Sequence, residues 1–118
     1  MSNLKKQNIQ ESFFLDTVLD IIYSQKLKDI IIYKGNNTLA YKNIIISTAN
    51  SYTQMNGVVK KITDILKDKS SLSVEGKDSS WLLIEAKEVL IHIFTNDSRK
   101  FYELEDIYFD CELIYQNG

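Results

Sequence analysis

Runs of consecutive isoleucines most constrain how this chain can fold. Residues 29–33 contain Ile30-Ile31-Ile32, and residues 41–48 contain Ile44-Ile45-Ile46. β-Branched side chains favour strands. Successive side chains of a strand point to opposite faces, so the unbroken run at residues 44–46 is typical of a strand that is covered on both faces. The polar stretch 34–37 after the first run, Lys-Gly-Asn-Asn, predicts a turn.

Two helices are expected from apolar residues spaced three and four positions apart. The first covers about residues 8–27, and the second continues to about Asp68. Ser51 and Gln54 have the spacing of a capping box at the start of the second helix. In such a box each side chain satisfies a free backbone donor of the other residue.

The second half of the chain predicts three more strands and a last helix. The strands are expected at residues 72–74, 81–84 and 89–94. The tight connection 85–88 indicates a hairpin between the last two strands. Asn96 or Asp97 can cap the final helix, whose apolar stripe is Phe101, Leu104, Ile107 and Tyr108.

These elements predict an α/β (α+β) fold with a single mixed sheet of about five strands flanked by helices. The 118 residues suit one domain, since domains most often have about 100–150 residues. We therefore expect a single domain over residues 1–118, with flexible ends at 1–7 and 110–118.

Several classes of protein have no support in the sequence. Cys111 is the only cysteine, so an internal disulfide and a cysteine-based zinc site are excluded. No segment approaches the roughly 20 apolar residues of a membrane span, and we expect a cytoplasmic protein. No phosphate-binding glycine loop is present. His92, the only histidine, lies in the middle of a predicted strand, which favours a hydrogen-bonded structural role over catalysis.

Charge is distributed unevenly along the chain. Residues 1–74 carry ten lysines and six acidic residues, whereas residues 75–118 carry ten acidic and four basic residues. Such asymmetry indicates an interaction surface, with segregated solvated faces as the alternative. The net charge of −2 gives no general attraction to nucleic acid.

Three ordered motifs give the chain a resemblance to a known family. They are Val74-Glu75-Gly76 followed after a polar stretch by Trp81-Leu82-Leu83-Ile84-Glu85, then Val89-Leu90-Ile91-His92-Ile93-Phe94, and finally Arg99 with Phe101-Tyr102 and Leu104-Glu105. Together they resemble the bacterial ribosomal silencing factor (RsfS/Iojap) family, and the likeness in layout extends over about residues 9–108.

The resemblance implies a nucleotidyltransferase-like fold without the catalytic motif, no enzymatic activity, no cofactor and no metal. It also implies a partner, large-subunit ribosomal protein fourteen, on the surface that meets the small subunit. A domain bound there blocks subunit joining and represses translation when nutrients are scarce. The alternatives are a large-subunit assembly factor that uses the same docking face and a residual nucleotide-binding domain. Whether the free protein is a homodimer stays open, and no membrane or sequence-specific nucleic-acid partner is implied.

The candidates for partner binding are motif residues together with Glu88 of the acidic turn 85–88, all in the acidic half that suits a basic ribosomal protein. They are Glu75, Trp81, Glu85, Glu88, Arg99, Tyr102 and Glu105. Trp81 is the expected anchor, because tryptophan is enriched at binding hot spots, with a core tryptophan as the alternative. Arg99 is expected either to pair with Glu75 or to face the partner.

The chain departs from the family pattern at several positions. It has Leu39-Ala40-Tyr41 where a polar or acidic residue is usual, no arginine within residues 50–54, Ile107-Tyr108 in place of Leu-Trp, and Glu85 in place of aspartate. These differences concern the details of partner contact more than the fold.

Overall fold

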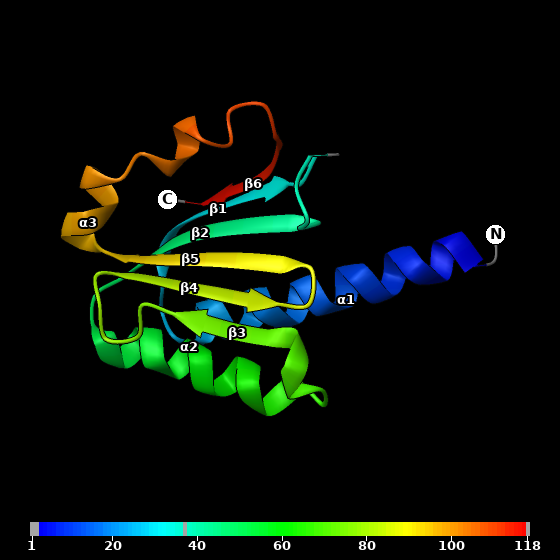
Figure 1. The fold of residues 1–118 in the computed structure, drawn as a ribbon, viewed down its shortest axis with the longest axis horizontal. Coiled ribbons are helices and arrows are strands. Elements are labelled where there is room, and N and C mark those ends of the chain that lie inside the picture. Colours follow the sequence, from blue (N-terminus) through cyan, green and yellow to red (C-terminus); the bar gives the residue numbers. More distant parts are fainter. Residues whose placement is uncertain (1–2, 37, 118) are drawn as a thin grey trace.

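Six strands form a single mixed sheet with helices packed on it (Figure 1). The computed structural model describes residues 3–36 and 38–117, with side chains for 13–36, 38–104 and 106–117. The elements are α1 (Asn3–Ser24), β1 (Lys28–Lys34), β2 (Asn43–Ala49), α2 (Tyr52–Ile65), η1 (Lys69–Ser71), β3 (Leu72–Glu75), β4 (Trp81–Ala86), β5 (Val89–Thr95), α3 (Asn96–Phe101), η2 (Leu104–Asp106) and β6 (Glu112–Asn117).

The strand order is β3-β4-β5-β2-β1-β6. The central pair β2 and β5 is parallel, and the other neighbouring strands are antiparallel. Ile44, Ile45 and Ile46 of β2 are all 0% exposed, which confirms a strand covered on both faces. The mixed sheet flanked by helices is also confirmed, although it has six strands rather than about five.

Helices α1 and α2 cover one face of the sheet, which we call the helical face. Its core joins residues of both helices, such as Val18, Ile22 and Ile62, to alternate residues of the strands, such as Ile45 and Ile91. In Figure 1 the N-terminal part of α1 reaches beyond the ends of the strands. This helix begins at Asn3 rather than at about residue 8. The flexibility expected for residues 1–7 stays a prediction.

The predicted capping box of α2 is formed in part. The Ser51 hydroxyl accepts a hydrogen bond from the Gln54 backbone N–H at 3.2 Å. The Gln54 side chain accepts from the Asn50 N–H at 2.6 Å, one residue before the expected partner. Both bonds satisfy backbone donors close to the helix start, as a capping box does.

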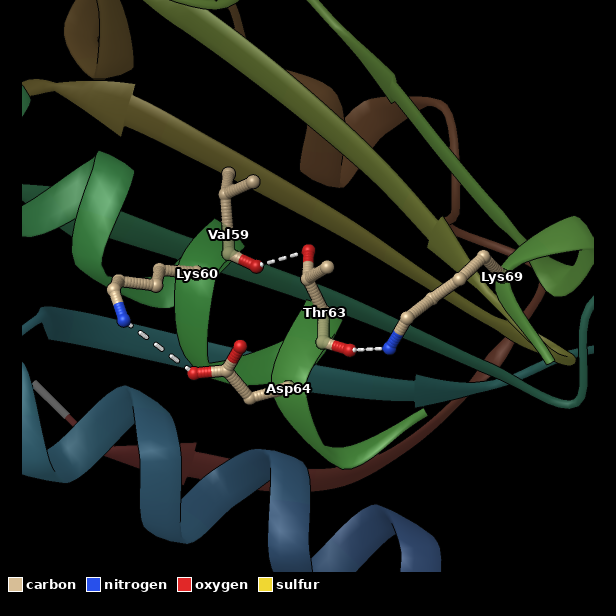
Figure 2. Close-up of polar contacts among 5 residues, drawn as sticks. All are labelled: Val59, Lys60, Thr63, Asp64 and Lys69. Atoms are coloured by element: carbon tan, nitrogen blue, oxygen red, sulfur yellow. Dashed lines mark hydrogen bonds and ion pairs between the residues drawn. The ribbon is translucent and has the colours of Figure 1, made fainter. Parts of the chain in front are cut away.

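At its other end α2 stops at Ile65, three residues before the expected end. The Lys69 ammonium donates hydrogen bonds to the backbone carbonyls of Thr63 and Leu66, and Figure 2 shows the first of these contacts. Leu66 turns to an extended conformation and is buried. Lys69 thus satisfies carbonyls that the end of the helix leaves without an intrahelical partner.

The final helix differs from the prediction, which had one continuous stripe from Phe101 to Tyr108. The helix α3 is capped by Thr95 rather than by Asn96 or Asp97, and it ends at Phe101. Tyr102 is extended, and η2 follows after a break. The break lets Leu104 and Tyr108 pack on the sheet, where both are buried.

The sequence did not predict the last strand, and the flexibility expected for residues 110–118 stays a prediction. Residues Glu112–Asn117 form β6, which pairs antiparallel with β1 and satisfies its edge. The Tyr115 hydroxyl is hydrogen-bonded to the Tyr23 hydroxyl of α1, and the Asn117 amide donates to the same Tyr23 oxygen at 2.9 Å. Residues 1, 2 and 118 lie outside the described residues, and the assignment of one domain to 1–118 stays a prediction.

Candidate functional site

The second face of the sheet is crossed by the chain between α3 and β6, and we call it the open face. Its core contains residues of the strands, such as Ile44, Leu90 and Phe94, together with Leu104 and Tyr108 from the crossing chain. This crossing chain, residues 102–111, is named the connecting segment. Trp81 and Leu83 of β4 lie beside it and stay half-buried, so this face is closed less fully than the helical face.

A tight turn between β3 and β4 places Trp81 at the start of its strand. Gly76 has a φ of 76°, and a Cβ at this position would lie 2.2 Å from the Trp81 carbonyl oxygen. Only glycine is therefore compatible with this turn. The Ser79 hydroxyl donates to the Gly76 carbonyl at 2.6 Å, and the Ser98 hydroxyl of α3 donates to the Ser80 carbonyl at 2.6 Å. The turn is thus fixed to α3.

The Trp81 ring lies within an aromatic cluster. Its centroid is 4.9 Å from that of Tyr102, 5.2 Å from that of Phe94 and 5.9 Å from that of His92. Phe94 is fully buried beneath it, whereas Tyr102 is 38% exposed. Tilted ring pairs at these distances are favourable contacts beyond the area that they bury. The structure therefore brings together two of the predicted site residues, Trp81 and Tyr102.

His92 forms hydrogen bonds through both of its ring nitrogens, as expected of a structural histidine. The Trp81 Nε1–H donates to His92 Nδ1 at 3.1 Å, and His92 Nε2 lies 3.0 Å from the Tyr108 hydroxyl. Its side chain is only 4% exposed. This burial lowers the pKa of His92 to about 4, because an imidazolium loses its hydration there.

Two predicted acidic residues also lie on the open face. Glu75 of β3 and Glu85 of β4 occupy alternate positions on the same side as Trp81. Glu85 lies close enough to the Tyr41 hydroxyl to act on its ionisation. The Glu85 side chain, then burial, raises the pKa of Tyr41 to about 12. Tyr41, in the β1–β2 connection, also packs against the core of the open face.

The remaining predicted site residues lie elsewhere. Arg99 Nη1 donates to the Asp29 carbonyl at 3.0 Å and to the Thr48 hydroxyl at 2.9 Å, which ties α3 to β1 and β2. Glu88 lies in the β4–β5 turn and forms an ion pair with Lys42 at 3.1 Å. This turn is at the opposite end of β4 from Trp81, about 17 Å away at roughly 3.3 Å per residue. The side chain of Glu105 lies outside the described residues.

Sequence reasoning did not select several residues that the structure places at this site. Tyr41 and Tyr108 lie on different loops, and no spacing rule joins either to Trp81. The sequence analysis also did not propose two exposed aromatic residues near these elements in the chain, Phe101 beside Tyr102 at 79% exposed and Phe109 of the connecting segment at 83% exposed. The alternation of side chains along a strand was the one available signal, because it puts Trp81 on the face shared by Leu83 and Glu85.

Metal-ligating groups and grooves among the described residues are the places where a metal or cofactor could bind. No group of three or more His, Cys, Asp or Glu side chains among them is placed to hold a metal ion. A groove of about 380 Å³ runs between α1 and α2, lined by Thr17, Asp20, Ile21, Ser24, Lys61, Asp64 and Ile65. It lies on the side of the helices, away from Trp81. Within the described residues no helix has the length and apolar character needed to cross a bilayer.

Comparisons with known proteins bear on the whole chain. A family model described as "Ribosomal silencing factor during starvation" matches residues 6–117. The Iojap protein of Arabidopsis thaliana chloroplasts is 36% identical over 66 residues, which are 54% of this chain and 28% of that protein. The ribosomal silencing factor RsfS of Bacillus subtilis is 32% identical over 73 residues, covering 58% of this chain and 61% of that one. The matched part is thus less than two thirds of either relative.

Solved structures agree with the observed fold. A protein of Bacillus halodurans superposes with a TM-score of 0.71 at 18% identity, covering 88% of this chain and 98% of that one. A protein of Chromobacterium violaceum gives a TM-score of 0.67 at 23% identity, with coverages of 78% and 80%. At these identities the likeness establishes the fold alone.

Proposed function

This chain belongs to the family of ribosomal silencing factors, and from that premise we propose that it binds the large ribosomal subunit and blocks joining of the small subunit. The proposed partner is large-subunit ribosomal protein fourteen, and the result is repression of translation when nutrients are scarce. We place this action in the cytoplasm. The protein acts by occupying a surface, so no catalytic step is required.

The observation that carries this proposal is the aromatic cluster on the open face. Trp81 and Tyr102 are both accessible and supported from below by the buried Phe94. A rigid, partly exposed tryptophan surrounded by other rings has the character of an interface anchor. Because Trp81 also packs on the core of the open face, the interface and core alternatives for this residue are not exclusive.

Acidic residues around this cluster favour a basic partner. Glu75 and Glu85 lie on the open face, and the exposed residues Glu103, Asp106 and Asp110 belong to the connecting segment. Ribosomal proteins are mostly basic, so this distribution supports electrostatic attraction and a defined orientation on docking. Glu88 and Arg99 contribute to the fold at their observed positions, and we assign the docking centre to Trp81 and Tyr102.

Co-sedimentation with purified ribosomal subunits tests the proposal. We expect the protein to migrate with large subunits and not with small ones, and to reduce the joined-ribosome peak when it is added before mixing. Migration at the top of the gradient with both subunits present contradicts the proposal. Binding without any effect on joining would favour the assembly alternative.

The substitution Trp81→Ala tests the docking centre. We expect binding to large subunits to weaken by about 2 kcal/mol, or roughly 30-fold, mainly through faster dissociation. Tyr52→Ala is the matched control, since Tyr52 is an aromatic residue of α2 that is 47% exposed. Thermal unfolding of both variants separates lost binding from lost folded protein. Equal binding by the folded Trp81→Ala variant and the wild type rules out this docking centre.

A further inference from the structure

His92 connects the two parts of the open face that the proposed docking surface combines. Its ring nitrogens reach Trp81 on one side, at 3.1 Å, and Tyr108 of the connecting segment on the other, at 3.0 Å. The chain contains one tryptophan and one histidine. The single buried imidazole is therefore hydrogen-bonded to the single indole.

The chemistry of the three groups fixes the tautomer of His92. An indole N–H is only a donor, so Nδ1 must accept its hydrogen bond and carry no hydrogen. The hydrogen of the neutral ring is then on Nε2, and this nitrogen donates to the Tyr108 oxygen. Protonation of Nδ1 would remove the acceptor, and burial opposes it.

The two hydrogen bonds have consequences for the exposed residues. The bond to Nδ1 directs the indole N–H into the protein, so Trp81 presents its carbon edge and face to solvent. The bond to Tyr108 holds the connecting segment on the sheet, where the Tyr108 ring also lies 5.8 Å from the ring of Tyr33. Both sides of the docking surface are thereby fixed before a partner arrives, which lowers the entropic cost of binding.

We propose that His92 is a positioning residue for docking: through its Nε2–H tautomer it orients Trp81 and anchors the connecting segment at Tyr108. This inference rests on the proposed function and deepens it, because it names the buried residue that prepares the surface. It also implies that the partner meets Trp81 with a group that packs on the ring and does not accept a hydrogen bond from the indole.

Nitrogen-15 spectra of the full chain test the tautomer directly. With one histidine and one tryptophan, each ring gives a single set of signals. We expect the His92 ring to show the Nε2–H pattern, and the indole N–H to exchange slowly with solvent. In His92→Phe the indole N–H should exchange faster, and Trp81 fluorescence should be quenched more readily by acrylamide. An Nδ1–H pattern in the wild type overturns the proposal.

Binding of the same variants to purified large subunits tests the positioning role. His92→Phe keeps an aromatic ring but loses both hydrogen bonds, and we expect about tenfold weaker binding. His92→Gln keeps one acceptor and one donor, so it should recover binding to within about threefold of the wild type. The control is Ser47→Ala, which removes a buried hydroxyl that donates to the His92 carbonyl at 3.3 Å and leaves its ring intact.

The outcomes distinguish this inference from the proposed function. If wild-type protein binds large subunits and folded His92→Phe binds equally well, the positioning role is wrong and the docking function stands. If Ser47→Ala weakens binding as much as His92→Phe, the effect is general destabilisation and the positioning role is again wrong. If the wild type binds neither subunit, the proposed function fails and the docking role of His92 fails with it.

Discussion

The two faces of the sheet are formed by the same strands but are covered in different ways. On the helical face two long helices bury an aliphatic layer, and its largest residues, such as Ile22 and Ile45, are 0% exposed. The open face is covered by the short helical turns of the connecting segment and by part of the β1–β2 connection, and its aromatic residues range from fully buried Phe94 to Phe109 at 83% exposed. The first face can supply stability through close packing, while the second keeps aromatic surface accessible to a partner.

The contrast also appears in the kind of contact. Contacts on the helical face are mainly between aliphatic side chains. Such contacts do not depend on pH, and their close packing tolerates little change in side-chain volume. The open face contains a buried imidazole, two tyrosine hydroxyls and carboxylates within one layer. This layer is held together partly by hydrogen bonds, and single substitutions can remove these bonds one at a time.

The largest effect on stability is expected on the helical face. Ile45→Ala removes buried methyl and methylene groups from the centre of β2, and such truncations cost about 2–5 kcal/mol of unfolding free energy. Chemical denaturation measures this loss, with Ile65→Ala as the control because Ile65 is 42% exposed. The folded fraction of Ile45→Ala should bind large subunits normally. If the folded Ile45→Ala protein binds large subunits more weakly than the wild type, the helical face also contributes to docking and the two faces do not have separate roles.

A smaller and pH-dependent effect is expected from His92 on the open face. Its pKa is lowered from 6.5 to about 4 in the folded protein, so the unfolded chain binds the proton first as pH falls. The stabilisation by neutral His92 is complete above pH 6.5 and is lost between pH 6.5 and about 4. The loss is on the order of 3 kcal/mol. Unfolding of the wild type and His92→Phe across this range isolates the contribution, because carboxylates titrate in both proteins. If the unfolding free energies of the two proteins change in parallel with pH, the pKa of His92 is not lowered by folding.

The smallest effects are expected from the acidic rim, where the two ends of β4 can be compared. Glu85→Lys places a positive charge on the open face beside Tyr41, so it should slow association with large subunits by several-fold at low salt. Glu88→Lys changes the distant turn and an exposed ion pair with Lys42, so it should change the association rate less than Glu85→Lys does. Association rates measured at two salt concentrations rank the variants. If Glu88→Lys slows association more than Glu85→Lys does, the docking surface includes the β4–β5 turn.

The local pattern of the sequence was sufficient for most elements. The isoleucine runs gave the buried strands, the tight connection 85–88 between two apolar runs gave the hairpin, and Ser51 marked the start of α2. Each of these signals depends on neighbours within a few residues. The missed elements lacked such a signal. Strand β6 owes its conformation to pairing with β1, and the break after Phe101 depends on where Leu104 and Tyr108 find a surface to pack on.

The candidate site was predictable only in part. Trp81 and Tyr102 came from one motif set and lie in contact in the structure. Glu88 and Arg99 were proposed for the same site, but neither lies in the aromatic cluster. Glu88 forms an ion pair with Lys42, and Arg99 donates hydrogen bonds to β1 and β2. Residues that are close together in a sequence motif need not lie on the same face or at the same end of the sheet. Residues six or seven positions apart on a hairpin can lie at opposite ends of a strand.

The sequence by itself determined the class of fold, the family and an aromatic residue at the start of β4, because hydrophobic periodicity and ordered motifs are written along the chain. Only the tertiary structure decided what surrounds that residue. Tyr41, His92, Phe94 and Tyr108 reach Trp81 or its face from three separate parts of the chain. Their meeting depends on strand order and on the path of the connecting segment, which are set by burial across the whole sheet rather than by local spacing.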